Sequence, residues 1–241
     1  MRSICKKELS QFFSSLTGYL AIGVFLLLMG LFLFIFPDTS ILDYGFATMD
    51  KFFELAPWVL LLLVPAITMR SFSDEFKSGT YELLKTKPLS YSQIIGGKYW
   101  ASFIVALLAL LPSLLYVFTI QQLIVKGNID TGGIAGSYIG LLMLTAVFTS
   151  IGICCSTITN NAVIAFLLSA VACFIFYNGF AAVSQIPSFK GSADYYIEQF
   201  GISNHYQSMS RGLIELKDVV YFLVVTVLFL WITRRQLIKK W

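Results

Sequence analysis

The stretch that decides the fold is Ile134–Ile158, IAGSYIGLLMLTAVFTSIGICCSTI, which contains no Asp, Glu, Lys or Arg. An α-helix needs about 20 predominantly apolar residues to cross the hydrocarbon core of a bilayer, and this segment is long enough. The charge-free region runs from Asp130 to Lys190, with only the polar turn Thr159-Asn160-Asn161 dividing it. Water cannot be the solvent of such a region, so it predicts two consecutive membrane-spanning helices.

The rest of the chain repeats this pattern. Of its 241 residues, 57% are hydrophobic and 12% are charged, whereas an average soluble domain has about 25% charged residues. We therefore predict an all-α integral membrane protein with one transmembrane domain over residues 1–241. The six predicted spans cover about 17–36, 55–69, 99–121, 134–158, 162–183 and 218–233.

Polar segments separate the predicted spans. Residues 1–16 form an amphipathic segment, 70–98 a polar segment between spans two and three, and 184–217 the longest loop. The first of these is too polar for the apolar core of a secretory signal, and no small-residue cleavage site follows span one, so we expect it to remain. Pro112 predicts a kink in span three.

The distribution of charge predicts the orientation. The N-terminus, 70–98, 159–161 and the C-terminus would lie on one side, and they hold 12 of the 17 Lys and Arg but only 4 of the 13 Asp and Glu. The positive-inside rule then places both termini in the cytoplasm, with the protein in the inner membrane of the cell. The net charge of +4 thus reflects topology, and without a basic stripe interleaved with aromatics we expect no nucleic-acid partner.

Polar residues inside the spans are uncharged. Ion-coupled transport requires an intramembrane carboxylate, a histidine or a broken-helix site, and the sequence shows none. Ser113, Thr145, Thr149 and Asn178 are candidates for lining a substrate path. The simpler interpretation, hydrogen bonds to their own or neighbouring helices, is favoured. His205 is the only histidine and lies in the 184–217 loop, where we expect a surface or interface residue.

The sequence contains no recognisable ATP-binding motif and no recognisable catalytic centre. A GxxxxGK[ST] phosphate loop is absent, as are a nucleophile–base set, paired intramembrane carboxylates and a metal-ligand cluster. We therefore expect no cofactor and no enzymatic activity, with ATP bound by another polypeptide. Gly132, Gly136 and Gly140 recur every fourth residue, which permits close helix packing but does not distinguish an internal contact from a dimer contact.

The segment Ser71–Ser90 predicts a short amphipathic helix between spans two and three. Gly79-Thr80 supplies a break with a plausible N-cap, and Glu82 in the first turn suits the helix dipole. Leu83 and Leu84 form an apolar face, and Pro88 ends the helix. A second short helix is expected over 90–95. Such a helix either lies on the membrane surface or docks into a groove on a cytoplasmic partner.

The residues of this segment carry a resemblance. The run Asp74-Glu75-x-x-x-Gly79-Thr80-x-Glu82-Leu83-Leu84-x-x-x-Pro88-x-Ser90 resembles the cytoplasmic loop of ABC-2-type transporter permeases, and Gly97-Lys98 resembles the Gly-Lys pair that opens span three in that family. The whole chain is also similar in length and general sequence to the gliding-motility-associated ABC permease subunit. The resemblance implies membrane lipid around the spans, a second permease chain, identical or related, and two ATPase subunits beneath the pair.

The resemblance also implies roles for residues. The helix around Asp74–Lys87 would be the ATPase-coupling element, and residues 6–13 the interfacial elbow helix. The expected coupling residues are Asp74, Glu75, Gly79, Thr80, Glu82, Leu83, Leu84 and Pro88. The leading hypothesis is the permease subunit of an ATP-driven ABC-2 exporter. A membrane scaffold of an envelope or motility complex is the alternative, and the cargo and the direction of transport stay open.

Overall fold

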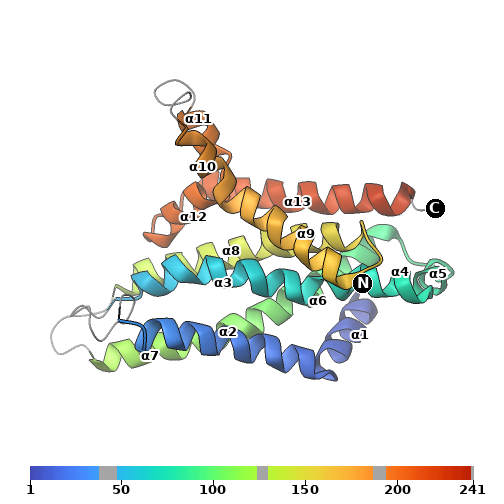
Figure 1. Ribbon diagram of the computed structural model, residues 1–241, viewed down its shortest axis with the longest axis horizontal. Helices are drawn as coiled ribbons and strands as arrows, with labels where there is room; N and C mark the ends of the chain where they lie inside the picture. Colours follow the sequence, from blue (N-terminus) through green and yellow to red (C-terminus); the bar gives the residue numbers. More distant parts are fainter. Residues whose placement is uncertain (38–47, 124–129, 187–193, 240–241) are drawn as a thin grey trace.

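A computed structural model describes residues 1–37, 48–123, 130–186 and 194–239. All regular elements in these ranges are helical, which confirms the predicted all-α fold (Figure 1). Five of the described helices are long and apolar enough to cross a membrane, and a sixth span is counted if the bent N-terminal pair forms one. The chain is therefore a multi-pass membrane protein with five or six candidate spans.

The N-terminal part of the fold comprises the helices α1 to α5. The amphipathic helix α1 (Arg2–Phe13) precedes α2 (Leu16–Phe34), and the two axes differ by 69° over the break. The next span, α3 (Asp50–Thr68), continues almost directly into α4 (Arg70–Ser78), which is followed by α5 (Thr80–Lys85). The elbow predicted before span one is present as α1.

The remaining spans surround the central helix α8. Span three is α6 (Tyr91–Leu110), the 3₁₀ turn η1 (Leu111–Ser113) and α7 (Leu114–Leu123). Next come α8 (Thr131–Ser156), α9 (Ala162–Phe174), the π-helical turn η2 (Ile175–Gly179) and α10 (Phe180–Ser184). The chain ends with α11 (Asp194–Gln199), α12 (Ile202–Ser210) and α13 (Leu216–Lys239).

Several predicted boundaries differ from the structure. Span two starts at Asp50 and its helix continues as α4, so 70–98 is not one polar loop. The predicted helix at 90–95 is the first turn of α6, because Ser90 and Gln93 form a capping box that starts the long helix there. The last helix extends past 233 to Lys239, since charged residues continue a helix beyond the apolar core. The break predicted at Pro112 is present as η1.

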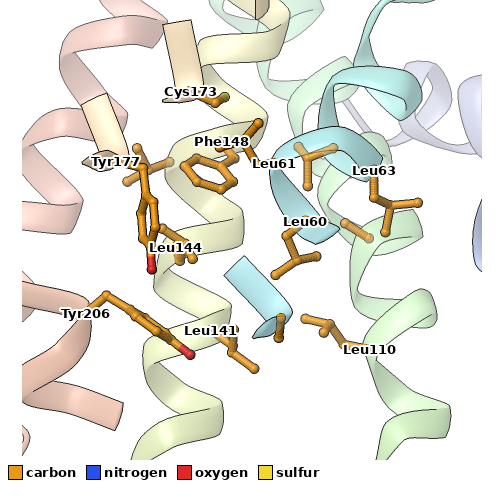
Figure 2. Packing of buried hydrophobic residues seen from close by; sticks show 14 of the residues in the cluster. Leu60, Leu61, Leu63, Leu110, Leu141, Leu144, Phe148, Cys173, Tyr177 and Tyr206 are labelled. Atoms are coloured by element: carbon orange, nitrogen blue, oxygen red, sulfur yellow. The ribbon is translucent and has the colours of Figure 1, made fainter. Parts of the chain in front are cut away.

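The core lies between α3, α6, α8 and the C-terminal helices. Figure 2 shows Leu60 and Leu61 of α3 on the side of Leu141, Leu144 and Phe148 of α8, while Leu63 lies on the side of α6, which carries Leu110. The apolar window of α8 is 78% buried inside the chain, whereas that of the span formed by α9, η2 and α10 is only 22% buried. Therefore α8 is the central helix, and α9 presents most of its surface to lipid or to another chain.

The two ends of the bundle carry different elements. Both chain termini lie at the same end, together with α1, α4 and α5, and we call this the terminal end (Figure 1). Helices α7, α11 and α12 lie toward the other end, which we call the distal end (Figure 1). This arrangement agrees with an even number of crossings.

Candidate functional site

The predicted coupling residues lie at the terminal end, on α4, on α5 and in the segments directly after each of them. Gly79 ends α4 with φ +72°, a conformation that glycine adopts without steric cost, and α5 starts directly after it. Gly79 itself is the N-cap of α5, so the break and the N-cap lie within the predicted pair Gly79-Thr80. The exposed members of the predicted set are Asp74, Gly79, Thr80, Glu82, Leu83 and Pro88.

Leu83 and Leu84 do not share one environment. The side chain of Leu83 is 66% exposed, although it is apolar. Leu84 is half-buried and packs on a small second core at the terminal end, whose buried members include Ile4, Phe72 and Tyr81. As a result, α5 is anchored through Tyr81 and Leu84 and presents Glu82 and Leu83 outward.

Glu75 faces inward, unlike its neighbours. One of its carboxylate oxygens, Oε1, lies 2.9 Å from the Nζ atom of Lys98, whose side chain is only 1% exposed. Glu8 of α1 approaches the same ammonium group at 2.9 Å, and the carbonyl oxygen of Ser71 accepts a hydrogen bond from it at 2.5 Å. We call Lys98, Glu75, Glu8 and the Ser71 carbonyl the Lys98 cluster. It joins α1, α4 and α6 by one buried charge.

The surroundings of the Lys98 cluster are partly apolar and partly wet. The ring of Phe72 lies under the ammonium group, 4.9 Å from Nζ to the centroid. Lys7, whose side chain is 57% exposed, lies 3.3 Å from Glu75 and connects the cluster to solvent. The nearby phenol of Tyr81 has its pKa raised to about 12 by burial first, and then by the charges of Tyr91 and Glu75.

Gly97 explains how α1 reaches this cluster. A Cβ atom on Gly97 would lie 2.8 Å from the Cβ of Ile4 and 3.2 Å from the carbonyl oxygen of Met1. A side chain at position 97 would therefore push α1 away from α6. The pair Gly97-Lys98 thus has a structural meaning: the glycine lets the elbow helix approach, and the lysine binds its Glu8.

A large apolar groove runs from this cluster along the spans. Its volume is about 780 Å³. Helices α1, α2, α3, α4 and α6 form its walls, and α9 contributes Phe166. Glu8, Gln11, Arg70 and Asp74 line its polar end, next to the Lys98 cluster. The apolar remainder includes Phe25, Leu28, Phe32, Trp58, Leu62 and Phe166. This groove therefore has both charged groups and apolar surface in its lining.

The four candidate path residues lie elsewhere and do not line this groove. Thr145 and Thr149 are buried and donate to carbonyl groups of their own helix at 2.7 Å. Ser113 donates to the Leu110 carbonyl at 2.6 Å and lies 3.0 Å from the Tyr138 hydroxyl. Asn178 is half-buried in the π-helical turn η2. A role for them in the substrate path stays a prediction.

Two of the three glycines of the predicted repeat in α8 make an internal contact. A Cβ atom on Gly136 would lie 2.9 Å from the Cα of Gly212, and one on Gly140 would lie 2.9 Å from the Cβ of Met209. These glycines allow α12 and the turn after it to pack on α8. Gly132 instead lies beside Asp130, the N-cap of α8. The glycine repeat therefore serves the fold of a single chain.

His205 was expected at the surface or at an interface, and the structure buries it at the distal end, at the contact between α11, α12 and α13. Its Nδ1 lies 2.7 Å from Oδ1 of Asp218 on α13, and its Nε2 lies 2.9 Å from the carbonyl oxygen of Gln199. The ring of Tyr221 stacks on the imidazole with 4.0 Å between centroids. In the described part of the chain, no three His, Cys, Asp or Glu residues are grouped to hold a metal ion.

Sequence reasoning placed the terminal-end residues in one segment but missed two of their partners. Lys98 and Glu8 are 90 positions apart, so no local pattern relates them. One signal was present: a lysine directly after Gly97 at the start of an apolar helix requires either solvent or an anionic partner.

These features define a class: a multi-pass helical membrane protein with an elbow helix, a helical projection between spans two and three and a charged joint connecting them. The chain matches the family described as ABC-2 family transporter protein over residues 16–234. It therefore belongs to the ABC-2 transporter family, and its 241 residues contain the membrane permease part and no ATPase domain. Membership implies an ATPase partner. No curated protein matches the chain.

Proposed function

We propose that this chain is the permease subunit of an ATP-driven exporter in the inner membrane of the cell, with its terminal end in the cytoplasm. The charge distribution supports this orientation, because the terminal end collects most Lys and Arg residues. Arg234 and Arg235 lie there near the end of α13, and Arg235 lies 4.8 Å from the ring of Trp231, as in an interfacial anchor.

The projection α4–α5 is the proposed docking element for the ATPase. The observation that carries this proposal is the opposite orientation of Glu75 and Glu82: the first is bound to Lys98, while the second is exposed beside Leu83. A movement of α5 reaches α3 through the nearly continuous helix α4, and it reaches α1 and α6 through the Lys98 cluster. Glu82, Leu83 and Pro88 would contact the ATPase, and Asp74, Gly79 and Thr80 would border the contact.

A second permease chain completes the proposed transporter. The groove between α2 and α3 is open, and Trp58 and Leu62 on its rim are 41% and 54% exposed. Helix α9 exposes a further apolar surface, including Leu167 and Val171. A second chain against this side would close the groove into a passage between two subunits. The second chain is either identical, which gives a homodimer, or a related subunit, which gives a heterodimer. Co-purification of two differently tagged copies of this chain distinguishes the two.

The coupling proposal is tested by Glu82→Arg. We expect this substitution to reduce co-purification of the ATPase subunit by at least about tenfold, since reversing a charge at a contact opposes binding. ATP hydrolysis by the purified complex should fall with it. The matched control is Glu198→Arg, which reverses an exposed carboxylate on α11 at the distal end. Unchanged ATPase binding by Glu82→Arg, in a chain that still inserts in membranes, would contradict the assignment.

A narrower proposal places the exporter among the gliding-motility-associated ABC transporters, and it is supported by the similarity of the whole chain in length and sequence. Deletion of the gene should then abolish spreading of the cells on a surface, and the Glu82→Arg chain should fail to restore it. Restoration by Glu82→Arg, with ATPase binding lost, would indicate the scaffold function instead.

A further inference from the structure

The distal end contains a histidine with two hydrogen-bond acceptors. Nδ1 of His205 on α12 lies 2.7 Å from the Asp218 carboxylate of α13. Nε2 lies 2.9 Å from the Gln199 carbonyl, at the end of α11. His205 is 9% exposed and Asp218 is 1% exposed, so water does not compete with these bonds. One imidazole ring thereby links three helices.

The chemistry of the two partners determines where protons must be. A carbonyl oxygen only accepts, and an ionised carboxylate only accepts, whereas a neutral imidazole has a single N–H. A neutral ring beside an ionised Asp218 would leave one nitrogen lone pair facing an oxygen lone pair at hydrogen-bond distance. We infer that His205 and Asp218 form a buried proton-binding site, in which the ring carries a proton on both nitrogens at neutral pH. The proton resides on the ring because imidazole is a stronger base than carboxylate.

The surroundings make this proton structurally necessary. Tyr221 stacks on the ring and donates to the Phe200 carbonyl at 2.6 Å, which covers the pair from one side. Oδ2 of Asp218 is buried and has no hydrogen-bond partner in the described part of the chain. Without the imidazolium, Asp218 would be a buried carboxylate with no compensating charge, a costly arrangement.

No other described charge replaces the proton. The elements packed most extensively on α12 are α8, α11, α13 and η2. Helix α3 also accepts a hydrogen bond from α12 at Phe53, where the neighbouring Glu54 is exposed. Helix α8 carries no Asp, Glu, Lys, Arg or His, and the carboxylate of Glu198 on α11 belongs to an exposed residue. On α13, Lys217 forms an exposed pair with Glu215 at 2.7 Å. The ring of Tyr177 from η2 lies against Tyr206, 6.4 Å between centroids.

The bound proton therefore clamps α11 and α12 onto the start of α13. Helix α12 also donates from the Tyr206 hydroxyl to the Phe53 carbonyl of α3 at 2.6 Å, so loosening α12 would affect the core spans. This inference is independent of the docking role proposed for α5.

The test measures the protonation of the ring. His205 is the only histidine in the chain, so ¹⁵N-histidine labelling with a histidine-free tag gives one imidazole signal pair. In lipid nanodiscs at pH 7.5, we expect both ring nitrogens of the full chain to carry protons. An exposed histidine would be about 90% neutral at that pH. A pyridine-type nitrogen in the unmodified chain would overturn the inference.

The matched variant is Asp218→Asn, whose amide has the shape of the carboxyl group. The amide N–H can donate to Nδ1 while Nε2–H donates to the Gln199 carbonyl, so the same bonds form around a neutral ring. We expect one pyridine-type nitrogen in this variant at pH 7.5. Glu215→Gln, which removes an exposed carboxylate nearby, should leave the doubly protonated signal unchanged. An Asp218→Asn ring that stays doubly protonated would contradict the assignment of the proton to this pair.

Discussion

At the terminal end, Lys98 lies between two carboxylates and a carbonyl oxygen, and Lys7 connects this cluster to solvent. At the distal end, His205 lies between one carboxylate and a carbonyl oxygen, and Tyr221 covers it. Each site joins three helices through one nitrogen-containing side chain. A lysine ammonium keeps its charge across the physiological pH range, whereas an imidazole gains and loses its charge within it.

Because of this difference, the two ends are suited to different tasks. A joint that transmits movement between an ATPase and the spans must hold under all conditions, and the Lys98 cluster provides a permanent charge with two partners. A segment that opens on a signal requires a bond that can be lost, and the distal pair depends on a single proton. The comparison predicts a larger loss of stability from damage to the first site than from damage to the second.

The largest effect is expected from Lys98→Met. This change removes the shared cation and leaves Glu8 and Glu75 close to each other and largely buried, which typically costs about 3 kcal/mol or more. We expect a clear fall in the thermal unfolding temperature in detergent and loss of ATPase coupling. Both should be measured together, by unfolding of the purified chain and by ATP hydrolysis in the reconstituted complex.

The double variant Lys98→Met with Glu75→Gln separates charge from packing. If repulsion and burial of unpaired carboxylates cause the instability, neutralising Glu75 should restore about half of the lost stability. Coupling to the ATPase should stay impaired, because α4 and α6 are no longer joined. A Lys98→Met chain as stable as the unmodified one would show that the terminal end does not depend on this cluster.

The second largest effect is expected from the close helix approaches, one at each end. Gly97→Ala and Gly136→Ala each place a Cβ within 3 Å of the packed neighbour, Ile4 in the first case and the Gly212 backbone in the second. Overpacking of this kind typically costs about 1–3 kcal/mol. The unfolding temperature reports the loss in both variants, and only Gly97→Ala should also reduce ATPase coupling.

Gly23→Ala is the matched control for these two variants. A Cβ on Gly23 would have no atom within 4 Å, and the residue lies inside α2, where alanine favours the helix. We expect unchanged or slightly higher stability. Equal losses in all three variants would mean that the close approaches at Gly97 and Gly136 carry no special weight.

The sequence predicted the spans and the projection because hydropathy and capping are local properties. The apolar runs predicted the membrane helices, Pro112 predicted the kink in span three, and the motif around Glu82 predicted the helix α5. The inward turn of Glu75 was not predictable, since its rotational position follows from α4 continuing α3, and its partner lies on another helix. Similarly, the burial of His205 was not predictable, because the segment expected to be a loop contains the helix α12, which turns His205 toward Asp218.

The smallest effect is expected from Tyr81→Phe at the terminal end, and it depends on pH. The pKa of the folded-state phenol is about 12, raised by burial and then by Tyr91 and Glu75, compared with the usual 10.0. The unfolded chain therefore releases this proton first, so the contribution to stability is complete below pH 10 and decreases as the pH rises from about 10 to 12. Unfolding measured from pH 7 to pH 11 should show Tyr81→Phe within about 1 kcal/mol of the unmodified chain at pH 7. Above pH 10 the variant should lose stability less steeply. Identical pH profiles of the two chains would mean that burial of the Tyr81 phenol does not contribute to the alkaline limit of the terminal end.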